Sequence, residues 1–407
     1  MSAVAAPDGS SGFAVYVHVP FCVRRCTYCD FPIVVGLSAA ARSRYLDAVV
    51  AEWTRETLPP GPITSVYFGG GTPSLADPRD IGRVLEALAA RAAIPLGAEV
   101  TLEANPATVV ASRLADYRAA GINRVSLGVQ AAQSHHLRRL HREHDVVDAH
   151  RAVRQLRRAR FDNVSVDAIY GLPDQTLAEW RETIRCLTSW EPEHVSLYAL
   201  QVEEGTPLAR SVGRGAAALP GEDVVGDMAD LAEAVLPAMG YRRYELSNFS
   251  RPGRESRHNR AYWRHHPYIG VGAGAHSFEI GLAGARRWWN GRHVRRYVTE
   301  TLEGGDPTVG EERLSWAQLA GEAVWLGLRE RGGVSLPAFR ERFGISLDQA
   351  FPGVLGPLVD GHLIHRTPDT IHLTGRGMAL GNQVFSRFLT AVLPPPGAAE
   401  VAGAETR

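Results

Sequence analysis

The sequence contains no lysine, so all 44 of its basic residues are arginine, and 44 acidic residues balance them. The formal net charge is therefore zero at pH 7, and the isoelectric point lies near 7.3. A neutral chain lacks the overall electrostatic footprint of a nucleic-acid-binding protein, although a local basic patch can still exist. We expect no nucleic-acid partner.

Long apolar runs are also absent. No stretch reaches the ~18 consecutive apolar residues of a membrane-spanning helix. Residues 1–12 lack the cationic start and apolar core of a signal peptide. We expect this segment and residues 391–407 to be disordered, and the protein to be cytoplasmic without a transmembrane segment. The sequence does not indicate an oligomeric state.

Cysteine is scarce, with four in 407 residues, which excludes a disulfide-stapled scaffold. With 45% hydrophobic and 22% charged residues, the composition is that of a globular chain of roughly two to three domains. Six short β-rich apolar runs alternate with amphipathic stretches, at residues 13–20, 65–69, 99–103, 124–130, 163–169 and 194–200. Such alternation predicts an α/β fold with parallel strands, and six units favour a barrel over a flat sheet. Chemistry in these folds collects where the strands end.

The sequence changes character after residue 245. Residues 251–296 hold ten arginines, five histidines and six aromatic residues but only two acidic ones. The glycine-rich stretch at 304–310 is interpreted as a linker. Helical patterns and a hairpin at 362–374 follow it and resemble a winged-helix domain. The predicted units are the barrel (13–245), the Arg/His/aromatic-rich segment packed on it (246–303) and the C-terminal domain (311–390).

Three of the four cysteines, Cys22, Cys26 and Cys29, form a C-x3-C-x2-C arrangement just after the first predicted strand. Three thiolates on an iron–sulfur cluster would leave one iron open to another ligand. The alternatives are a zinc site completed by His18 and a disulfide with an odd cysteine left over. Cys186 lies in an apolar stripe and is interpreted as a packing residue.

The segment from Tyr16 through the three cysteines resembles the radical S-adenosylmethionine superfamily, in which a partial (βα)6 barrel holds a 4Fe-4S cluster. The resemblance implies contacts to S-adenosylmethionine from residues at successive strand ends: Tyr16, Tyr28, Gly70, Gly71, Thr72, Glu103, Gln130, Arg142 and Asp167. Glu103 suits ribose hydroxyls, and the Arg142 guanidinium suits the methionine carboxylate. Alternatively, Glu103 and Asp167 cap helices and Arg142 forms a solvated salt bridge.

The resemblance also implies reductive cleavage of the bound sulfonium, with an electron donor such as flavodoxin or ferredoxin. No acid–base pair or catalytic triad stands out in the sequence, and none is needed, because the cofactor carries the chemistry.

Within this superfamily the chain resembles the branch of the oxygen-independent coproporphyrinogen dehydrogenases (HemN) and the HemW heme chaperones. The dehydrogenases have a further cysteine where this chain has Phe31. The sequence His258-Asn259-Arg260-Ala261-Tyr262-Trp263 instead matches the H-N-x-x-Y-W motif of the chaperones. The predicted heme contacts are His258, Asn259, Tyr262 and Trp263.

Arginines, aromatic rings and imidazoles suit the propionates, the macrocycle and the iron of heme, respectively. His258 is the preferred axial ligand, with His265, His266, His276 and His293 as competitors. Alternatively, the His-Asn pair supports a buried loop, or the segment grips single-stranded nucleic acid.

The resemblance therefore predicts a heme chaperone that binds a 4Fe-4S cluster, S-adenosylmethionine and heme, and transfers heme to an unknown acceptor protein. The alternatives are a coproporphyrinogen III dehydrogenase and a radical methyltransferase or cyclopropanase of the same branch. Whether the cofactor is cleaved in the course of this function cannot be read from the sequence.

Overall fold

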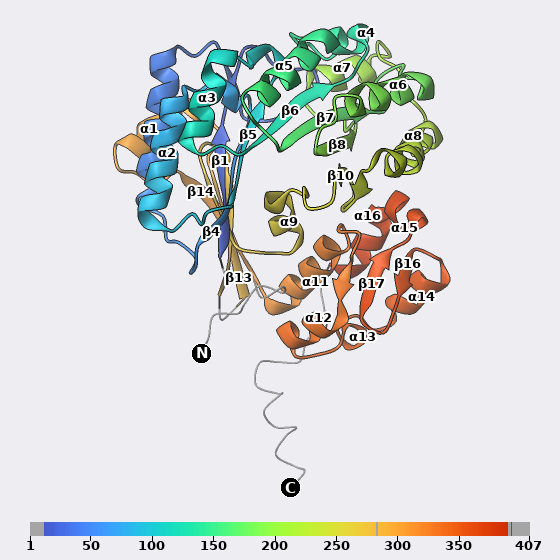
Figure 1. Ribbon diagram of the computed structural model, residues 1–407. Coiled ribbons are helices and arrows are strands. Elements are labelled where there is room, and N and C mark those ends of the chain that lie inside the picture. Colours follow the sequence, from blue (N-terminus) through green and yellow to red (C-terminus); the bar gives the residue numbers. More distant parts are fainter. Residues whose placement is uncertain (1–11, 282–283, 390–391, 393–407) are drawn as a thin grey trace.

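Seven parallel strands form the centre of a twelve-stranded sheet in the computed structural model, which describes residues 12–281, 284–389 and 392 (Figure 1). The order is β14-β13-β12-β11-β1-β4-β5-β6-β7-β8-β10-β9. The six predicted strands are neighbours in this order: β1 (Phe13–Val19), β4 (Ile63–Gly70), β5 (Glu99–Ala104), β6 (Arg124–Gln130), β7 (Val164–Tyr170) and β8 (His194–Ala199). β1 pairs on its other side with β11, and β8 with β10, so the barrel stays open. The prediction of a partial (βα)6 barrel is confirmed.

A layer of helices covers the outer face of these strands (Figure 1). The helices are α1 (Ala39–Trp53), α2 (Pro78–Arg91), α3 (Ala111–Ala120), α4 (Ser134–Arg139), α5 (Val146–Arg158), α6 (Leu177–Thr188), α7 (Pro207–Gly213) and α8 (Glu222–Val235). The starts of α1, α2, α5 and α6 follow from the sequence. The side chain that precedes each helix accepts a hydrogen bond from a backbone amide of its first turn; these residues are Ser38, Asp77, Asp145 and Thr176. The strands are largely buried on both faces, which explains their continuous apolar sequences.

Residues 246–303, predicted to pack on the barrel, lie on both sides of its six strands in the sheet order. They continue its sheet through β10 (Asn248–Ser250), β11 (Tyr268–Val271), β12 (His276–Gly281) and β13 (Gly284–Asn290), and include α9 (Arg257–Trp263) and α10 (Val294–Leu302). The short strand β9 (Arg242–Arg243) pairs with β10. The linker prediction for 304–310 is wrong, because the edge strand β14 (Thr308–Leu314) begins there and pairs with β13. Its glycine-rich, charged sequence has one exposed face and hides the strand pattern.

The C-terminal domain has its own apolar core, which runs from Ala320 to Phe388. Its helices are α11 (Trp316–Gly327), α12 (Leu336–Phe343), α13 (Leu347–Ala350), α14 (Leu355–Asp360), α15 (Gly375–Ala379) and α16 (Gly381–Phe385). The predicted hairpin is present as β16 (Ile364–Arg366) and β17 (Thr370–Leu373), and β15 (Val334–Ser335) adds a third strand. Four short 3-10 turns complete the chain, at Pro73–Leu75, Pro106–Thr108, Pro237–Met239 and Ser386–Phe388.

Ion pairs attach this domain to α9. Glu330, just beyond α11, receives Arg260 at 3.2 Å and Arg264 at 3.0 Å. Helix α9 consequently lies between the sheet and the C-terminal domain (Figure 1). The motif residues of α9 are therefore held where the two parts of the molecule meet.

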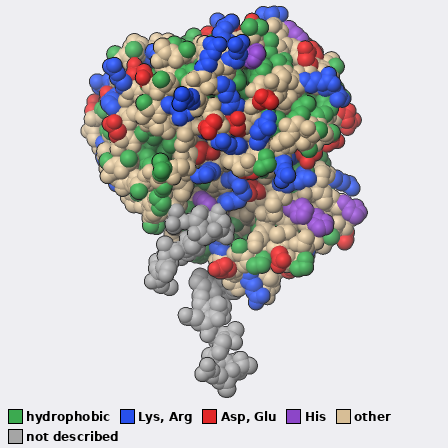
Figure 2. All heavy atoms as spheres, viewed as in Figure 1, with side chains coloured by type: hydrophobic (Ala, Val, Ile, Leu, Met, Phe, Trp, Pro, Cys, Tyr) green, Lys and Arg blue, Asp and Glu red, His purple; other side chains and the backbone are tan. Residues whose placement is uncertain are grey.

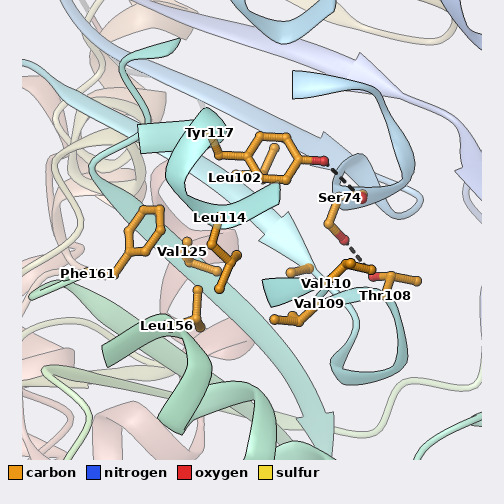
Figure 3. A pocket seen from close by; sticks show the side chains of 11 residues that line it. Ser74, Leu102, Thr108, Val109, Val110, Leu114, Tyr117, Val125, Leu156 and Phe161 are labelled. Carbon is orange, nitrogen blue, oxygen red and sulfur yellow. Dashed lines mark hydrogen bonds between the residues drawn. The ribbon is translucent and has the colours of Figure 1, made fainter. Parts of the chain in front are cut away.

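A small pocket under α3 belongs to the core (Figure 3). Its volume is about 10 Å³, room for about one water molecule, and most of its lining is apolar. The Tyr117 hydroxyl, which points along it, donates to the Ser74 carbonyl at 3.0 Å. We interpret this pocket as a packing gap.

The chain as a whole has a formal net charge of zero. Arginine and acidic side chains are interspersed over the face shown in Figure 2. Within the described part of the chain, no helix is both long and apolar enough to cross a membrane. The predictions of disorder for 1–12 and 391–407 lie outside the described residues, except for residues 12 and 392.

Candidate functional site

A cavity of about 1760 Å³ opens at the C-terminal ends of the parallel strands. All the predicted site residues line it except Tyr16 and His258. Those that do are Cys22, Cys26, Cys29, Tyr28, Gly70, Gly71, Thr72, Glu103, Gln130, Arg142, Asp167, Asn259, Tyr262 and Trp263. The predicted S-adenosylmethionine contacts and the predicted heme contacts therefore line one cavity, apart from Tyr16 and His258.

The cysteine loop leaves the barrel through a two-residue strand, β2 (Phe21–Cys22), which pairs with β3 (Val34–Val35). The Cys22 Sγ lies 3.8 Å from the Thr72 hydroxyl. Burial, together with the neighbouring thiols, raises the pKa of Cys22 to about 11. A bound cation is what would hold such thiols as thiolates, the form that ligates metal.

The spacing of the sulfur atoms bears on the zinc alternative. Among the described residues, the three loop sulfurs do not form a group in which all members lie within 4.8 Å of one another, so at least one pair of these sulfurs is farther apart than that. Zinc–sulfur bonds of about 2.3 Å would bring sulfurs to within ~3.8 Å. His18 offers no ring nitrogen, because its Nδ1 contacts the Tyr16 hydroxyl at 3.1 Å and its Nε2 the Pro32 carbonyl at 3.0 Å. The donor set thus fits a polynuclear cluster better than one zinc ion.

Gly70 and Gly71 let the backbone approach the cysteine loop. Gly70 has φ +113°, in the region that favours glycine. A Cβ on Gly71 would lie 2.7 Å from the carbonyl oxygen of Phe21. Only a glycine fits at position 71 without moving the chain just before Cys22.

Glu103 is held at the end of β5 by two donors from β4. The Tyr67 hydroxyl donates to its Oε1 at 2.7 Å, and the Gly70 amide donates to its Oε2 at 3.0 Å. Burial raises the pKa of Glu103 to about 7, with a further contribution from Asp167, against these hydrogen bonds. The carboxylate keeps free lone pairs toward the cavity and does not cap a helix, which removes the alternative for Glu103.

Gln130 and Arg142 lie together over Gly128. A bulge at the end of β6 gives Gln130 a φ of +74°, a strained conformation for a residue other than glycine. The Arg142 guanidinium donates to the Gly128 carbonyl at 2.6 Å and lies 3.5 Å from the Cys26 Sγ. Arg142 therefore sits beside the cysteine loop and not in a solvated salt bridge.

Asp167 stands on β7 between two serines. Ser126 donates to both of its oxygens, at 3.1 and 2.9 Å, and Ser165 donates to Oδ1 at 3.0 Å. Burial raises the pKa of Asp167, whereas the serine hydroxyls lower it. Like Glu103, this carboxylate is oriented by strand residues and not by a helix.

Tyr16 and His258 lie behind Tyr67 and not on the cavity surface. The His258 ring stacks on Tyr67 at 4.9 Å. Its Nδ1 contacts the Ser65 hydroxyl, and its Nε2 the Tyr262 hydroxyl, both at 3.0 Å. Burial lowers the pKa of His258 to about 3. Both ring nitrogens are thus engaged in this conformation, which does not favour the predicted role of His258 as axial ligand.

Two of the competing histidines are also engaged: His265 contacts Glu322 at 3.3 Å, and His293 caps α10. His276 and His266 do not line the cavity. Among the described residues, the histidine that does is His141, which is exposed and has φ +58°. No sequence signal marks it.

Several other cavity residues escaped sequence analysis. Tyr67 and Ser126 could have been found as polar residues at inward positions of apolar strands. Arg329 and residues 378–383 reach the cavity from the C-terminal domain. Their contribution to the cavity depends on how the C-terminal domain packs on the rest of the chain. No local sequence pattern encodes that packing.

The fold and this site define a radical SAM protein. Residues 16–187 match the model of the Radical SAM superfamily, and residues 314–380 match that of the HemN C-terminal domain. HemN of Escherichia coli has the same fold, with a TM-score of 0.79 at 22% identity, over 93% of this chain and 90% of that one.

Closer relatives narrow the class. The heme chaperone HemW of Bacillus subtilis is 34% identical over 92% of this chain and 99% of its own length. The heme chaperone HemW of Mycobacterium tuberculosis is 37% identical over 94% of this chain and 96% of its own. The chain belongs to the HemW family of the radical SAM superfamily.

Proposed function

We propose that this protein is a cytoplasmic heme chaperone that holds a 4Fe-4S cluster on its three loop cysteines, binds S-adenosylmethionine and heme, and passes heme to an acceptor protein. The names of its relatives support this proposal. The observation that carries it is one continuous cavity, bounded by the cysteine loop, the motif helix α9 and the C-terminal domain.

The strand ends suit S-adenosylmethionine. Glu103 would accept hydrogen bonds from the ribose hydroxyls, and Arg142 and Gln130 would bind the methionine end beside Cys26. The cluster, when bound, supplies an open iron for the cofactor and an electron for its reductive cleavage. The residues of the chain orient the cofactor and exclude water.

The size of the cavity supports a second ligand. Pockets for single small molecules usually measure about 300–1,000 Å³, and this one is larger, at about 1760 Å³. Tyr262, Trp263 and Phe385 supply aromatic surface for a flat macrocycle. Heme would lie on this side of the cavity.

Arg329 suits a heme propionate. Its guanidinium lies 4.4 Å from the centre of the Trp263 ring, and its Nε is buried without a hydrogen-bond partner. A carboxylate would satisfy this donor and balance the buried charge.

His141 replaces His258 as the expected axial ligand, since it is the histidine on the cavity surface. The His141→Ala variant should alter the spectrum of bound heme, whereas His258→Ala should act through the packing of Tyr67. An unchanged spectrum in His141→Ala would exclude this assignment.

Heme titration of the anaerobically reconstituted protein tests the proposal. We expect a saturable Soret shift and no release of carbon dioxide from coproporphyrinogen. Phe31, which lines the cavity where the dehydrogenases have a further cysteine, supports the second expectation. Titration without the cluster measures whether heme binding needs it. Absence of saturable binding, or carbon dioxide release at catalytic rates, would contradict the proposal.

A matched pair of variants tests the propionate contact. Arg329→Gln should weaken heme binding about 10- to 150-fold, the value of a hydrogen bond to a charged group of ~1.5–3 kcal/mol. Arg331→Gln is the control, because Arg331 is exposed and pairs with Glu233 at 3.0 Å. Equal affinities of the two variants would exclude the contact.

A further inference from the structure

Two histidines and a glutamate meet outside the cavity, between α4 and α6. The Nε2 of His135 lies 3.1 Å from Oε1 of Glu179, and the Nε2 of His136 lies 3.6 Å from its Oε2. Among the described residues, these form the group of three potential metal ligands whose donor atoms all lie within 4.8 Å of one another. Nitrogen and oxygen ligands of one zinc ion, with bonds of about 2.0–2.1 Å, are separated by ~3.3 Å.

The neighbours of His136 are Glu179, at 3.6 Å, and the ring of His135, whose centre lies 4.0 Å away. The His136 side chain is 0% exposed, and neither ring nitrogen makes a hydrogen bond. Burial of a polar group without a hydrogen bond is unfavourable. A metal ion at Nε2 would satisfy the ring at the atom that faces Glu179.

Glu179 is already oriented to share an ion. Its Oε2 accepts hydrogen bonds from the backbone and the hydroxyl of Thr176, both at 2.9 Å. This capping box turns Oε1 toward His135. Metal-binding carboxylates are commonly held by such outer hydrogen bonds.

We propose that His135, His136 and Glu179 form a binding site for a divalent transition metal, with zinc as the ion that best suits two imidazoles and a carboxylate. Three protein ligands leave a fourth position open to water. The site ties α4 to α6 and is separate from the cysteine loop.

The position of α4 gives this site a consequence for the cysteine loop. At the other end of the helix, the Leu140 carbonyl accepts the Thr27 amide at 3.3 Å, and the Arg139 carbonyl accepts the Thr27 hydroxyl at 3.1 Å. Thr27 lies between Cys26 and Tyr28. A metal ion that fixes α4 would thus hold the loop that carries the cysteines.

Zinc analysis of the full chain tests the proposal. The protein with its cluster reconstituted is stripped with a chelating resin, dialysed against zinc and analysed for metals. We expect one zinc per chain, and its loss in His136→Asn and in Glu179→Gln. His365→Asn is the control, because the His365 and His372 ring centres lie 5.0 Å apart on the C-terminal hairpin, where a surface pair could also hold zinc.

Three further measurements make the outcome decisive. The full chain with all three loop cysteines replaced by alanine should still bind zinc, and cobalt should give visible absorption bands in it that are lost in His136→Asn. Circular dichroism and iron content distinguish a misfolded variant from one that has lost only the zinc site. If His136→Asn does not fold, Glu179→Gln replaces it, because Glu179 is partly exposed. No zinc in the wild type, undiminished zinc in Glu179→Gln, or zinc lost only with the cysteines or in His365→Asn would overturn the proposal.

Discussion

Replacement of Glu103 by glutamine should weaken S-adenosylmethionine binding and remove part of its pH dependence. Ribose hydroxyls donate hydrogen bonds, so the ionised carboxylate is the form that binds them. The pKa of Glu103 is raised to about 7, chiefly by burial. Cofactor affinity should therefore rise with pH through 7.

The size of the effect follows from this pKa. The carboxylate would be about nine-tenths ionised at pH 8 and one-tenth ionised at pH 6, because one pH unit is a factor of ten. The Glu103 contribution should thus change affinity roughly tenfold over this interval. The groups that face Glu103 set its pKa: Tyr67 and the Gly70 amide donate to it, Asp167 raises the pKa and Arg124 lowers it. Loss of the charged acceptor itself should cost about 1.5–3 kcal/mol at pH 8.

Equilibrium dialysis of labelled S-adenosylmethionine between pH 6 and 8 measures both effects. The cofactor has a titratable amine of its own, so the informative quantity is the difference in slope between wild type and Glu103→Gln. Glu203→Gln, an exposed carboxyl of the same cavity, is the control and should keep the wild-type slope. Identical slopes in wild type and Glu103→Gln would refute this account of the site.

Two stability predictions concern Gly71, after β4, and Glu52, on α1. Gly71→Ala should destabilise the fold by ~1–3 kcal/mol and lower the iron content, because the new Cβ would press on the backbone of Phe21. Gly213→Ala is the control, because a Cβ at Gly213 would have no atom within 4 Å. Equal iron content in the two variants would contradict this argument. Burial raises the pKa of Glu52 to about 8, so the stability gained from its protonated form is lost as pH rises from ~4.5 through 8. The midpoint of denaturation should be lower at pH 8 than at pH 6 in the wild type, and this difference should be smaller in Glu52→Gln. Equal differences in the two proteins would exclude this contribution of Glu52.

The sequence predicted the barrel strands to within about two residues because parallel strands buried on both faces are written as continuous apolar runs. The sequence predicted the cysteine loop because its three cysteines lie close together in the chain. The strand ends could be assigned to one site only through the parallel topology, which brings Glu103 and Asp167 to the same edge.

The basic segment shows why the rest could not be predicted. Its ten arginines look unbalanced within residues 251–296. In the folded protein, Arg286 pairs with Glu311 at 2.9 Å and Arg287 with Glu322 at 2.6 Å. These glutamates lie on β14 and α11, outside the segment, so part of its charge is balanced by partners that only the tertiary structure supplies.

The first and last residues of the H-N-x-x-Y-W motif, His258 and Trp263, have different surroundings in the structure. His258 packs on Tyr67, whose hydroxyl donates to Glu103, so the first residue of the motif supports the strand ends that line the cavity. Trp263, one and a half turns further along α9, lies against Arg329 of the C-terminal domain. A rigid helix of seven residues thus contacts both the strand ends and the domain junction. The motif therefore links the strand ends to the C-terminal domain, with its histidine buried against Tyr67 and its tryptophan on the cavity surface.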